Sequence, residues 1–157
     1  MYFLRNGADP NARCAILDIT PLSYALVSAS LSTIQLLFDH GGSVHCDQLL
    51  HYAAVRESED RLQVLEPLLQ KGSKTHLNTL LYSDDQKSMN MMCDTPRWTP
   101  LHAAAITGYV DVVRFLLESG CDPAIKDTRG NTPLSCAERH GHRAVMEVLQ
   151  RVTPLQD

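Results

Sequence analysis

Cysteine and histidine are the residue types in this chain whose chemistry could be catalytic or metal-binding. They form two groups that are close in sequence: His40, His45, Cys46 and His51, and then Cys136, His140 and His142. Zinc takes four ligands, usually seeded by a C-x-x-C or H-x-x-x-H pair, and neither group contains such a seed. A nucleophilic cysteine needs an electropositive environment and an oriented base, and the sequence shows neither. We therefore expect packing roles for these residues, with no catalytic residue, no metal and no cofactor.

Enzymes often carry a short motif that cradles phosphate, metal or nucleophile, and the chain has none of the common ones. It lacks a G-x-S-x-G elbow, a P-loop, a G-x-G-x-x-G fingerprint and an H-E-x-x-H helix. The alternative is an enzyme, or an enzyme accessory, with a pocket built by a long insertion and nearby Cys and His residues. In that case a single Cys or His substitution would abolish turnover.

Composition and charge limit which other classes of protein the chain can belong to. The 157 residues carry a net charge of −4, which gives no basic field for nucleic acid. No run approaches 18 uncharged apolar residues, and residues 1–5 lack a signal-peptide pattern, so we expect no membrane partner and no secretion. The odd count of 5 cysteines argues against a disulfide framework. An intracellular location, cytoplasmic or nuclear, follows as the expectation.

The helices expected to carry the cysteine and histidine residues belong to an internal repeat. Three phrases match one another: Thr20-Pro21-Leu22-Ser23-Tyr24-Ala25, Thr99-Pro100-Leu101-His102-Ala103-Ala104 and Thr132-Pro133-Leu134-Ser135-Cys136-Ala137. The last two begin 33 residues apart (132 − 99). In each phrase threonine can cap a helix and proline suits its first position. His102 can bond neighbouring backbone and so link one unit to the next.

The segment from Thr99 to Leu134 resembles an ankyrin repeat at nearly every defining position. The resemblance implies an all-α solenoid of stacked antiparallel helix pairs with outward β-hairpin fingers, acting as a non-catalytic protein–protein interaction module. We divide the chain, as one domain of residues 1–157, into a partial repeat at 1–19, repeats at about 20–47, 48–72, 99–131 and 132–152, and an insertion at about 73–93. The second repeat runs 24 residues from Gln48 to Gly72 against 21 from Thr99 to Gly120, so extra residues are expected in the turn at 56–61.

In such stacks the partner, another protein or a peptide segment, usually meets the fingers and the exposed side of the first helices. Tyrosine, tryptophan and arginine dominate binding hot spots. Transferred by position, the candidates are Tyr24, Tyr52, Arg56, Arg97, Trp98, Ile106, Arg129, Arg139 and His140. The competing interpretation is packing for each tyrosine, covering of the insertion for Trp98, and solvated charge for each arginine.

Two departures from the family pattern limit this transfer, and the insertion and the first unit leave further alternatives open. Arg97 stands where Gly130 stands in the next unit, so the finger before the third repeat is expected to be distorted. The connection from Gly41 to Gln48 spans only 7 residues, which interrupts the row of fingers and favours binding on the last two repeats. The insertion is rich in Leu and Met. It either forms a loose surface loop, or at least part of it packs back on the stack or meets a partner. The partial first unit leaves an uncapped end, so the sequence is either an excerpt of a longer repeat protein or self-associates through that end.

Overall fold

Stacked helix pairs make up the fold of this computed structural model, which describes residues 2–15, 17, 19–44, 48–72, 76–83, 85–91 and 94–152. The first helices of the pairs are α2 (Pro21–Ser28), α4 (Leu49–Ala54), α7 (Pro100–Thr107) and α9 (Pro133–His140). The second helices are α3 (Leu31–Asp39), α5 (Arg61–Gln70), α8 (Val110–Glu118) and α10 (Arg143–Val152). A short α1 (Tyr2–Arg5) precedes them, and α6 (Gln86–Met91) lies in the insertion.

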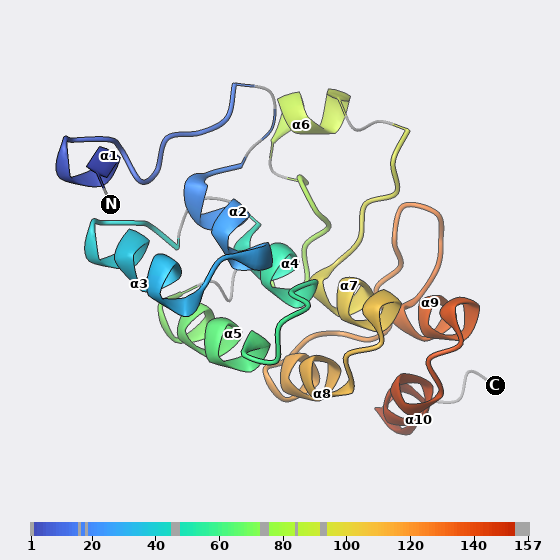
Figure 1. Ribbon diagram of the computed structural model, residues 1–157. Helices are drawn as coiled ribbons and strands as arrows, with labels where there is room; N and C mark the ends of the chain where they lie inside the picture. The colour runs from blue at the N-terminus through green and yellow to red at the C-terminus, as the bar shows by residue number, and fades with distance from the viewer. Residues whose placement is uncertain are drawn as a thin grey trace.

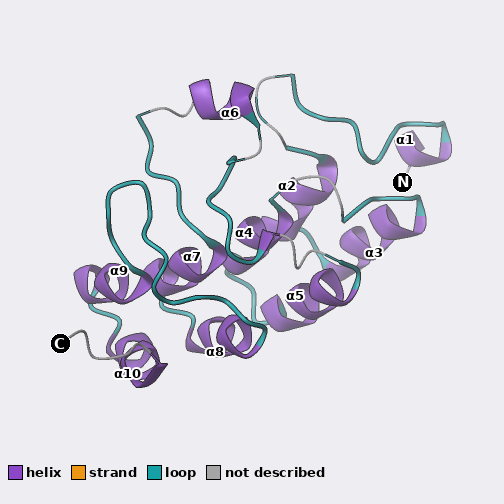
Figure 2. Cartoon of the chain, turned by 180° about the vertical axis from the view of Figure 1, so that it is seen from behind, coloured by secondary structure: helices purple, strands orange, loops and turns teal. Residues whose placement is uncertain are grey.

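The helices form two parallel rows, seen in Figure 1 as an upper row of first helices and a lower row of second helices. Within the upper row α2 contacts α4, α4 contacts α7, and α7 contacts α9. Figure 2 shows the connecting loops rising on the side of the first helices that faces away from the second helices. The all-helical solenoid expected from the sequence is confirmed. No strand occurs in the described ranges, so the β-hairpin form of the fingers is not confirmed.

Apolar side chains fill the space between the two rows. Leu26, Leu65, Leu101, Leu116 and Leu149 are fully buried and come from successive units. The buried residues form one continuous cluster along the stack. Each pair therefore buries its apolar face against its neighbours, because a single pair is too small to bury it alone.

The repeated Thr-Pro phrases cap the first helices as expected. Thr99 accepts a hydrogen bond from the His102 amide, and the His102 ring accepts one from the Thr99 amide at 3.3 Å. Thr20 with Ser23 and Thr132 with Ser135 form the same reciprocal cap. His102 also donates from Nε2 to the Asn131 carbonyl at 2.9 Å, which ties the third unit to the next finger.

The corners between paired helices differ from unit to unit. Gly108 and Gly141 end α7 and α9 in the left-handed conformation, with φ of 79° and 75°. Residues 55–60 join α4 to α5, which is the longer turn that the sequence indicated. Ala29 replaces the glycine at the end of α2 and stays extended at φ −77°.

Gly108 also lies against the next unit, which gives a prediction with a matched control. A Cβ on Gly108 would lie 2.5 Å from His142 Nδ1, whereas a Cβ on Gly141 meets nothing within 4 Å. Gly141→Ala should therefore cost about 1 kcal/mol of unfolding free energy from its left-handed backbone alone. Gly108→Ala should cost about 2–3 kcal/mol, because His142 must move and loses its bond to the Ile106 carbonyl. Urea unfolding of the two variants measures the difference, and equal losses would refute the contact.

The first part of the insertion packs back on the stack. Leu77, Leu81 and Tyr82 are buried. His51 of α4 donates from Nε2 to the Thr79 carbonyl at 3.0 Å, and the hydroxyls of Tyr52 and Tyr82 lie 2.5 Å apart. Of the two alternatives left by the sequence, packing holds for these residues.

One asparagine in the insertion performs the task that Asn11 performs in the first finger. Asn11 donates to the Gly41 carbonyl and accepts from the Ser43 amide at 2.9 and 2.7 Å. Asn78 donates to the Gly120 carbonyl and accepts from the Asp122 amide at 3.3 and 2.9 Å. Residues 76–79 therefore form the base of the finger that follows the second unit, and the additional chain lies beyond them.

Candidate partner-binding surface

The finger before α9 is held by one carboxylate. Asp127 accepts from the Arg129 amide at 2.9 Å and from the Asn131 amide at 2.8 Å. Its own amide donates to the Asn131 carbonyl at 2.8 Å, which closes the turn around Gly130. Thr128 and Arg129 are left exposed at the tip of this finger.

The fingers of the third and fourth units are joined to each other. The Thr128 amide donates to the Arg97 carbonyl at 3.1 Å, and the Arg97 amide donates to Thr128 Oγ1 at 2.9 Å. Tyr82 is the one non-glycine residue with positive φ in the described part of the chain, so Arg97 does not adopt the left-handed turn of Gly130. The finger at Arg97 therefore differs from the finger at Gly130, and it is hydrogen-bonded to that neighbouring finger through Thr128.

Three further candidates lie on the last two first helices. Ile106 is half-buried near the end of α7, and His142 donates to its carbonyl at 2.8 Å. Arg139 is exposed on α9 and donates from Nη2 to Asn131 Oδ1 at 2.7 Å, which holds its side chain toward the finger. His140 is exposed at the end of α9. Together with the half-buried Arg97 and Trp98 and the exposed Arg129, these residues belong to the fingers and first helices of the third and fourth units.

The two tyrosine candidates, Tyr24 and Tyr52, do not lie with the candidates on the third and fourth units. Tyr24 is 76% exposed on α2, at the other end of the stack. Tyr52 is half-buried under the insertion through its contact with Tyr82. The insertion thus covers the second unit where a partner would meet its first helix, and it interrupts the surface between Tyr24 and the last two units.

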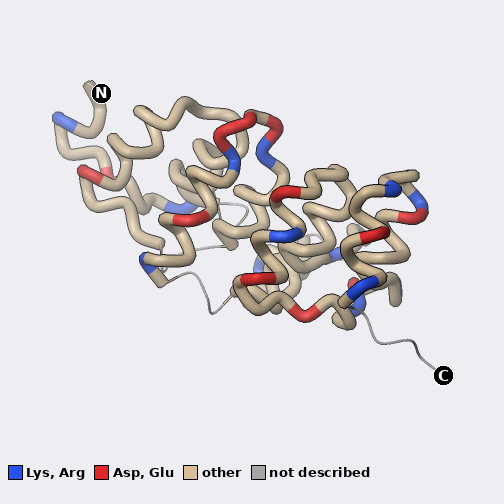
Figure 3. Tube along the Cα trace, turned by 90° about the horizontal axis from the view of Figure 1, so that it is seen from below, with Lys and Arg blue, Asp and Glu red and all other residues tan. Residues whose placement is uncertain are grey.

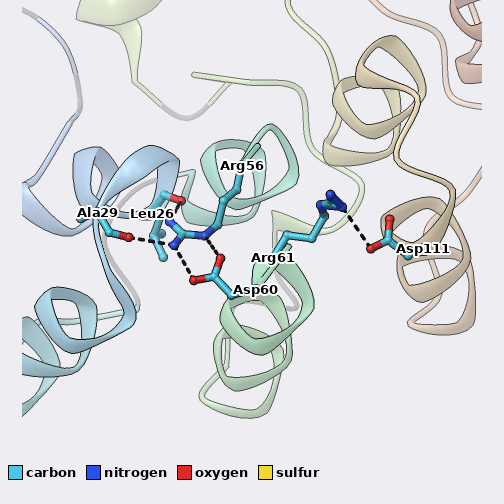
Figure 4. Close-up of polar contacts among 6 residues, drawn as sticks. All are labelled: Leu26, Ala29, Arg56, Asp60, Arg61 and Asp111. Carbon is cyan, nitrogen blue, oxygen red and sulfur yellow. Dashed lines mark hydrogen bonds and ion pairs between the residues drawn. The ribbon is translucent and has the colours of Figure 1, made fainter. Parts of the chain in front are cut away.

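Arg56 was expected to face outward, and that expectation is wrong. Its side chain is 2% exposed, and it donates to the Leu26 carbonyl at 3.2 Å and the Ala29 carbonyl at 2.8 Å (Figure 4). It also forms a bidentate pair with Asp60, at 2.5 and 2.8 Å. The hydrogen bond from Arg56 lowers the pKa of Asp60 to about 2. Because Ala29 cannot end α2 as glycine does, the guanidinium takes up the carbonyls left at that helix end.

The cysteine and histidine groups are arranged for packing. His140 Nδ1 donates to the Cys136 carbonyl at 2.8 Å, so this nitrogen is committed to backbone rather than to a thiol. Burial raises the pKa of Cys136, and burial raises the pKa of Cys121 to about 12, which disfavours the reactive thiolate. No set of three or more metal-ligating side chains gathers among the residues that the structure describes. His45 and Cys46 lie outside the described residues.

The pocket that the insertion forms with the first finger is small. It has a volume of about 180 Å³ and is lined by Arg13, Cys14 and Leu17 from the finger and by Asp85 and Lys87 from the insertion. Ligand pockets usually measure about 300–1,000 Å³. The cavity therefore offers little support to the alternative of an insertion-built active site.

Positions of basic residues (blue) and acidic residues (red) are interspersed along the stack in Figure 3. Arg61 bridges two units by lying over the Tyr109 ring at 4.1 Å and reaching Asp111 at 3.4 Å. Mixed charge of this kind does not favour a phosphate backbone, which requires a basic face. No helix in the described ranges is long and apolar enough to cross a membrane.

Paired helices stacked in two rows, with fingers on one side, define a helical repeat protein of the solenoid class. The model of ankyrin repeats (3 copies) matches residues 69–153, which is more than half of the chain. The chain therefore belongs to the ankyrin repeat family.

Individual relatives agree with this assignment. NF-kappa-B inhibitor alpha of Sus scrofa is 36% identical over 104 residues, which cover 66% of this chain and 28% of that protein. Ankyrin repeat protein nuc-2 of Neurospora crassa is 30% identical over 134 residues, covering 84% of this chain and 11% of that protein. The mitochondrial liver isoform of glutaminase from Rattus norvegicus is 29% identical over 154 residues, covering 87% of this chain and 26% of that enzyme. The chain thus spans less than a third of the length of each of these relatives.

Sequence reasoning missed the roles of Arg56, Asn78 and Tyr82, and the first two had a weak signal. Ala29 at a glycine position indicated a helix end in need of another cap. The Gly7-Ala8-Asp9-Pro10-Asn11 finger showed the asparagine that Asn78 repeats. Nothing in the sequence pointed to the contact between Tyr52 and Tyr82, because the two residues lie 30 positions apart.

Proposed function

We propose that the chain is a non-catalytic protein-binding module that captures another protein through the last two repeats. The partner meets the paired fingers and the first-helix face formed by Arg97, Trp98, Ile106, Arg129, Arg139 and His140. The observation that carries the proposal is the mutual hydrogen bonding of Arg97 and Thr128, which makes two fingers into one edge. A preorganised edge lowers the ordering cost of binding.

The chemistry of this surface suggests the chemistry of the partner. Three arginines lie with Trp98 and Ile106, so the best match is a protein segment carrying both acidic and apolar side chains. NF-kappa-B inhibitor alpha is by its name an inhibitor of another protein, and we propose the same mode, capture of a protein, for this chain. Tyr24 and Tyr52 take no part, since one lies at the far end and the other lies under the insertion. An intracellular location, cytoplasmic or nuclear, stays a prediction from the odd number of cysteines.

The test is affinity capture from cell extract by the parent chain and three variants, with quantification of every captured protein. Trp98→Ala and Arg129→Ala should each reduce capture of the partner about tenfold or more, as hot-spot truncations do. Arg114→Ala is the matched control, because Arg114 is an exposed arginine on α8 among the second helices. Thermal unfolding checks that the variant of half-buried Trp98 stays folded.

Two outcomes oppose the proposal. Capture that is unchanged by both finger variants places the binding surface elsewhere. A cysteine or histidine substitution that abolishes an enzymatic turnover while the fold survives favours the enzyme alternative, for which the glutaminase relative is the available comparison.

A further inference from the structure

One Thr-Pro dipeptide among the described residues takes no part in a helix. Besides the three phrases of the repeat, the sequence has Thr-Pro at Thr95 and at Thr153, and Thr153 lies outside the described residues. Helix α7 begins at Pro100 with Thr99 as its cap, so the exposed Thr95 lies in the non-helical segment before it. Because a residue before proline favours the extended conformation, Thr95 presents its hydroxyl on an exposed, extended stretch of chain.

The threonines of the three repeat phrases are engaged in helix caps instead. The side chains of Thr20, Thr99 and Thr132 each accept a hydrogen bond from an amide in the first turn of their helix. Thr20 is 3% exposed and Thr99 is 1% exposed, and Thr132 is half-buried. The proline after each of them is the first residue of a helix. An enzyme that needs an exposed hydroxyl in an extended Thr-Pro segment therefore finds it at Thr95 and not at these three threonines.

Two arginines, one from each of the joined fingers, are placed near Thr95. Arg97 follows two residues later, at most about 7 Å along an extended chain. Its backbone exchanges two hydrogen bonds with Thr128, at 3.1 and 2.9 Å, and the exposed Arg129 is the next residue of that finger. A phosphothreonine carries about two negative charges at pH 7 and forms charge-assisted hydrogen bonds when it faces arginines. The exposed Asp94 is the like charge beside this position.

We propose that Thr95 is phosphorylated by a proline-directed protein kinase, and that the phosphate closes the partner-binding surface by pairing with Arg97 and Arg129. In the transfer, a bond forms between Thr95 Oγ1 and the γ-phosphorus of ATP, and the bond from that phosphorus to the bridging oxygen breaks. ADP leaves with the electron pair, and the hydroxyl proton passes to the catalytic aspartate of the kinase. The regulatory half rests on the proposed function, because the same arginines would meet the acidic side chains of the partner.

The first test determines whether the folded chain is modified at Thr95. The chain carrying Thr153→Ala is incubated with ATP and a purified proline-directed kinase, and the phosphate is located by mass spectrometry. We expect phosphate on Thr95 and none after the further change Thr95→Ala. Synthetic peptides around Thr20, Thr99 and Thr132 should be substrates of the same kinase, since they lack the helix caps. A folded chain with no phosphate on Thr95, or with as much on Thr99, overturns the proposal.

A phosphorus NMR titration measures whether the phosphate pairs with the arginines. The second pKa of a phosphothreonine is ordinarily about 6, and a facing cation lowers it. We expect a lower second pKa in the folded chain than in a phosphopeptide of residues 92–98, which contains the same Asp94 and Arg97. Arg129→Ala should remove most of this difference, and Arg114→Ala should leave it unchanged. Equal pKa values in the chain and the peptide would refute the pairing.

The capture assay of the proposed function tests the regulation. The phosphorylated chain should capture the partner about tenfold less than the unmodified chain, because the dianion neutralises the arginines and repels acidic side chains. The Thr95→Ala variant treated with kinase and ATP should capture as much as the untreated parent. If Arg129→Ala weakens capture and phosphorylation does not, the regulation is wrong and the proposed function stands. If Arg129→Ala leaves capture unchanged, the proposed function and the regulation fail together, while mass spectrometry decides the modification site by itself.

Discussion

Replacing Arg56 with alanine should lower the free energy of unfolding by about 2–4 kcal/mol, because two helix-end carbonyls lose their donor and a buried side chain is removed. The side chain is 2% exposed and donates to Leu26, Ala29 and Asp60. The variant leaves two helix-end carbonyls without their donor and the Asp60 carboxylate without its cation. It therefore weakens the contact between the first and second units as well as the turn at 55–60.

Urea unfolding followed by the circular dichroism of the helices measures this loss of stability. Two further variants test whether the loss comes from the contacts of Arg56. Arg56→Lys should restore only a minor part of the free energy of unfolding that Arg56→Ala loses. An ammonium cannot donate to both carbonyls and to a bidentate carboxylate at once. Arg61→Ala should cost only about 1 kcal/mol, since its partner Asp111 is 42% exposed and the pair spans 3.4 Å. Losses of similar size at Arg56 and Arg61 would mean that the buried network does not matter to stability.

Acidification from pH 6.5 to pH 4 should lower the free energy of unfolding by about 3 kcal/mol through His51 alone. Burial, opposed by the hydrogen bond to Thr79, lowers the pKa of His51 from 6.5 to about 4. Between pH 6.5 and pH 4 the His51 ring is protonated in the unfolded chain and neutral in the folded chain, so the free energy of unfolding falls as the pH falls. Above pH 6.5 the ring is neutral in both states and His51 causes no loss of stability. Burial lowers the pKa of His102 as well, so its contribution has the same sign.

The assignment of this pH dependence to the buried ring of His51 can be tested. His51 donates from Nε2 to Thr79, and Nδ1 has no hydrogen-bond partner among the described residues, so a second proton would place a positive charge on a buried ring. His51→Gln should therefore show a clearly smaller loss between pH 6.5 and 4 in urea unfolding. Asn78→Ala, which removes a different anchor of the insertion, should lower stability equally at all these pH values and keep the slope. An unchanged slope in His51→Gln would refute the assignment.

Much of the fold was predictable because its determinants are local. Thr99 and His102 lie three residues apart and cap the same helix, so the phrase itself specifies the helix start. Gly108 likewise marks the helix end by its own backbone. The position of Arg56 was not predictable in this way, because its partners Leu26 and Ala29 lie in another unit.

In the candidate site, too, the residues whose positions follow from the repeat were predictable, and those that depend on distant contacts were not. Arg129 and Arg139 were correctly expected to be exposed, since their positions follow from the repeat register. The fate of Tyr52 depends on how the insertion folds, and the pattern of leucines and methionines there has no helical or strand period. Helix α6 was missed for that reason.

The hydrogen bond between the Leu81 amide and the Trp98 carbonyl, 2.9 Å long, has a consequence for how such chains diversify. It joins the two ends of the excursion through α6, so the excursion leaves and returns at one point, in the manner of an Ω-loop. The described contacts with the stack through Asn78, Tyr82 and Arg97 lie at the two ends of the excursion, outside residues 83–96. This stretch is in effect a cassette, which can be shortened, lengthened or exchanged to alter what the neighbouring fingers recognise while the scaffold is left intact.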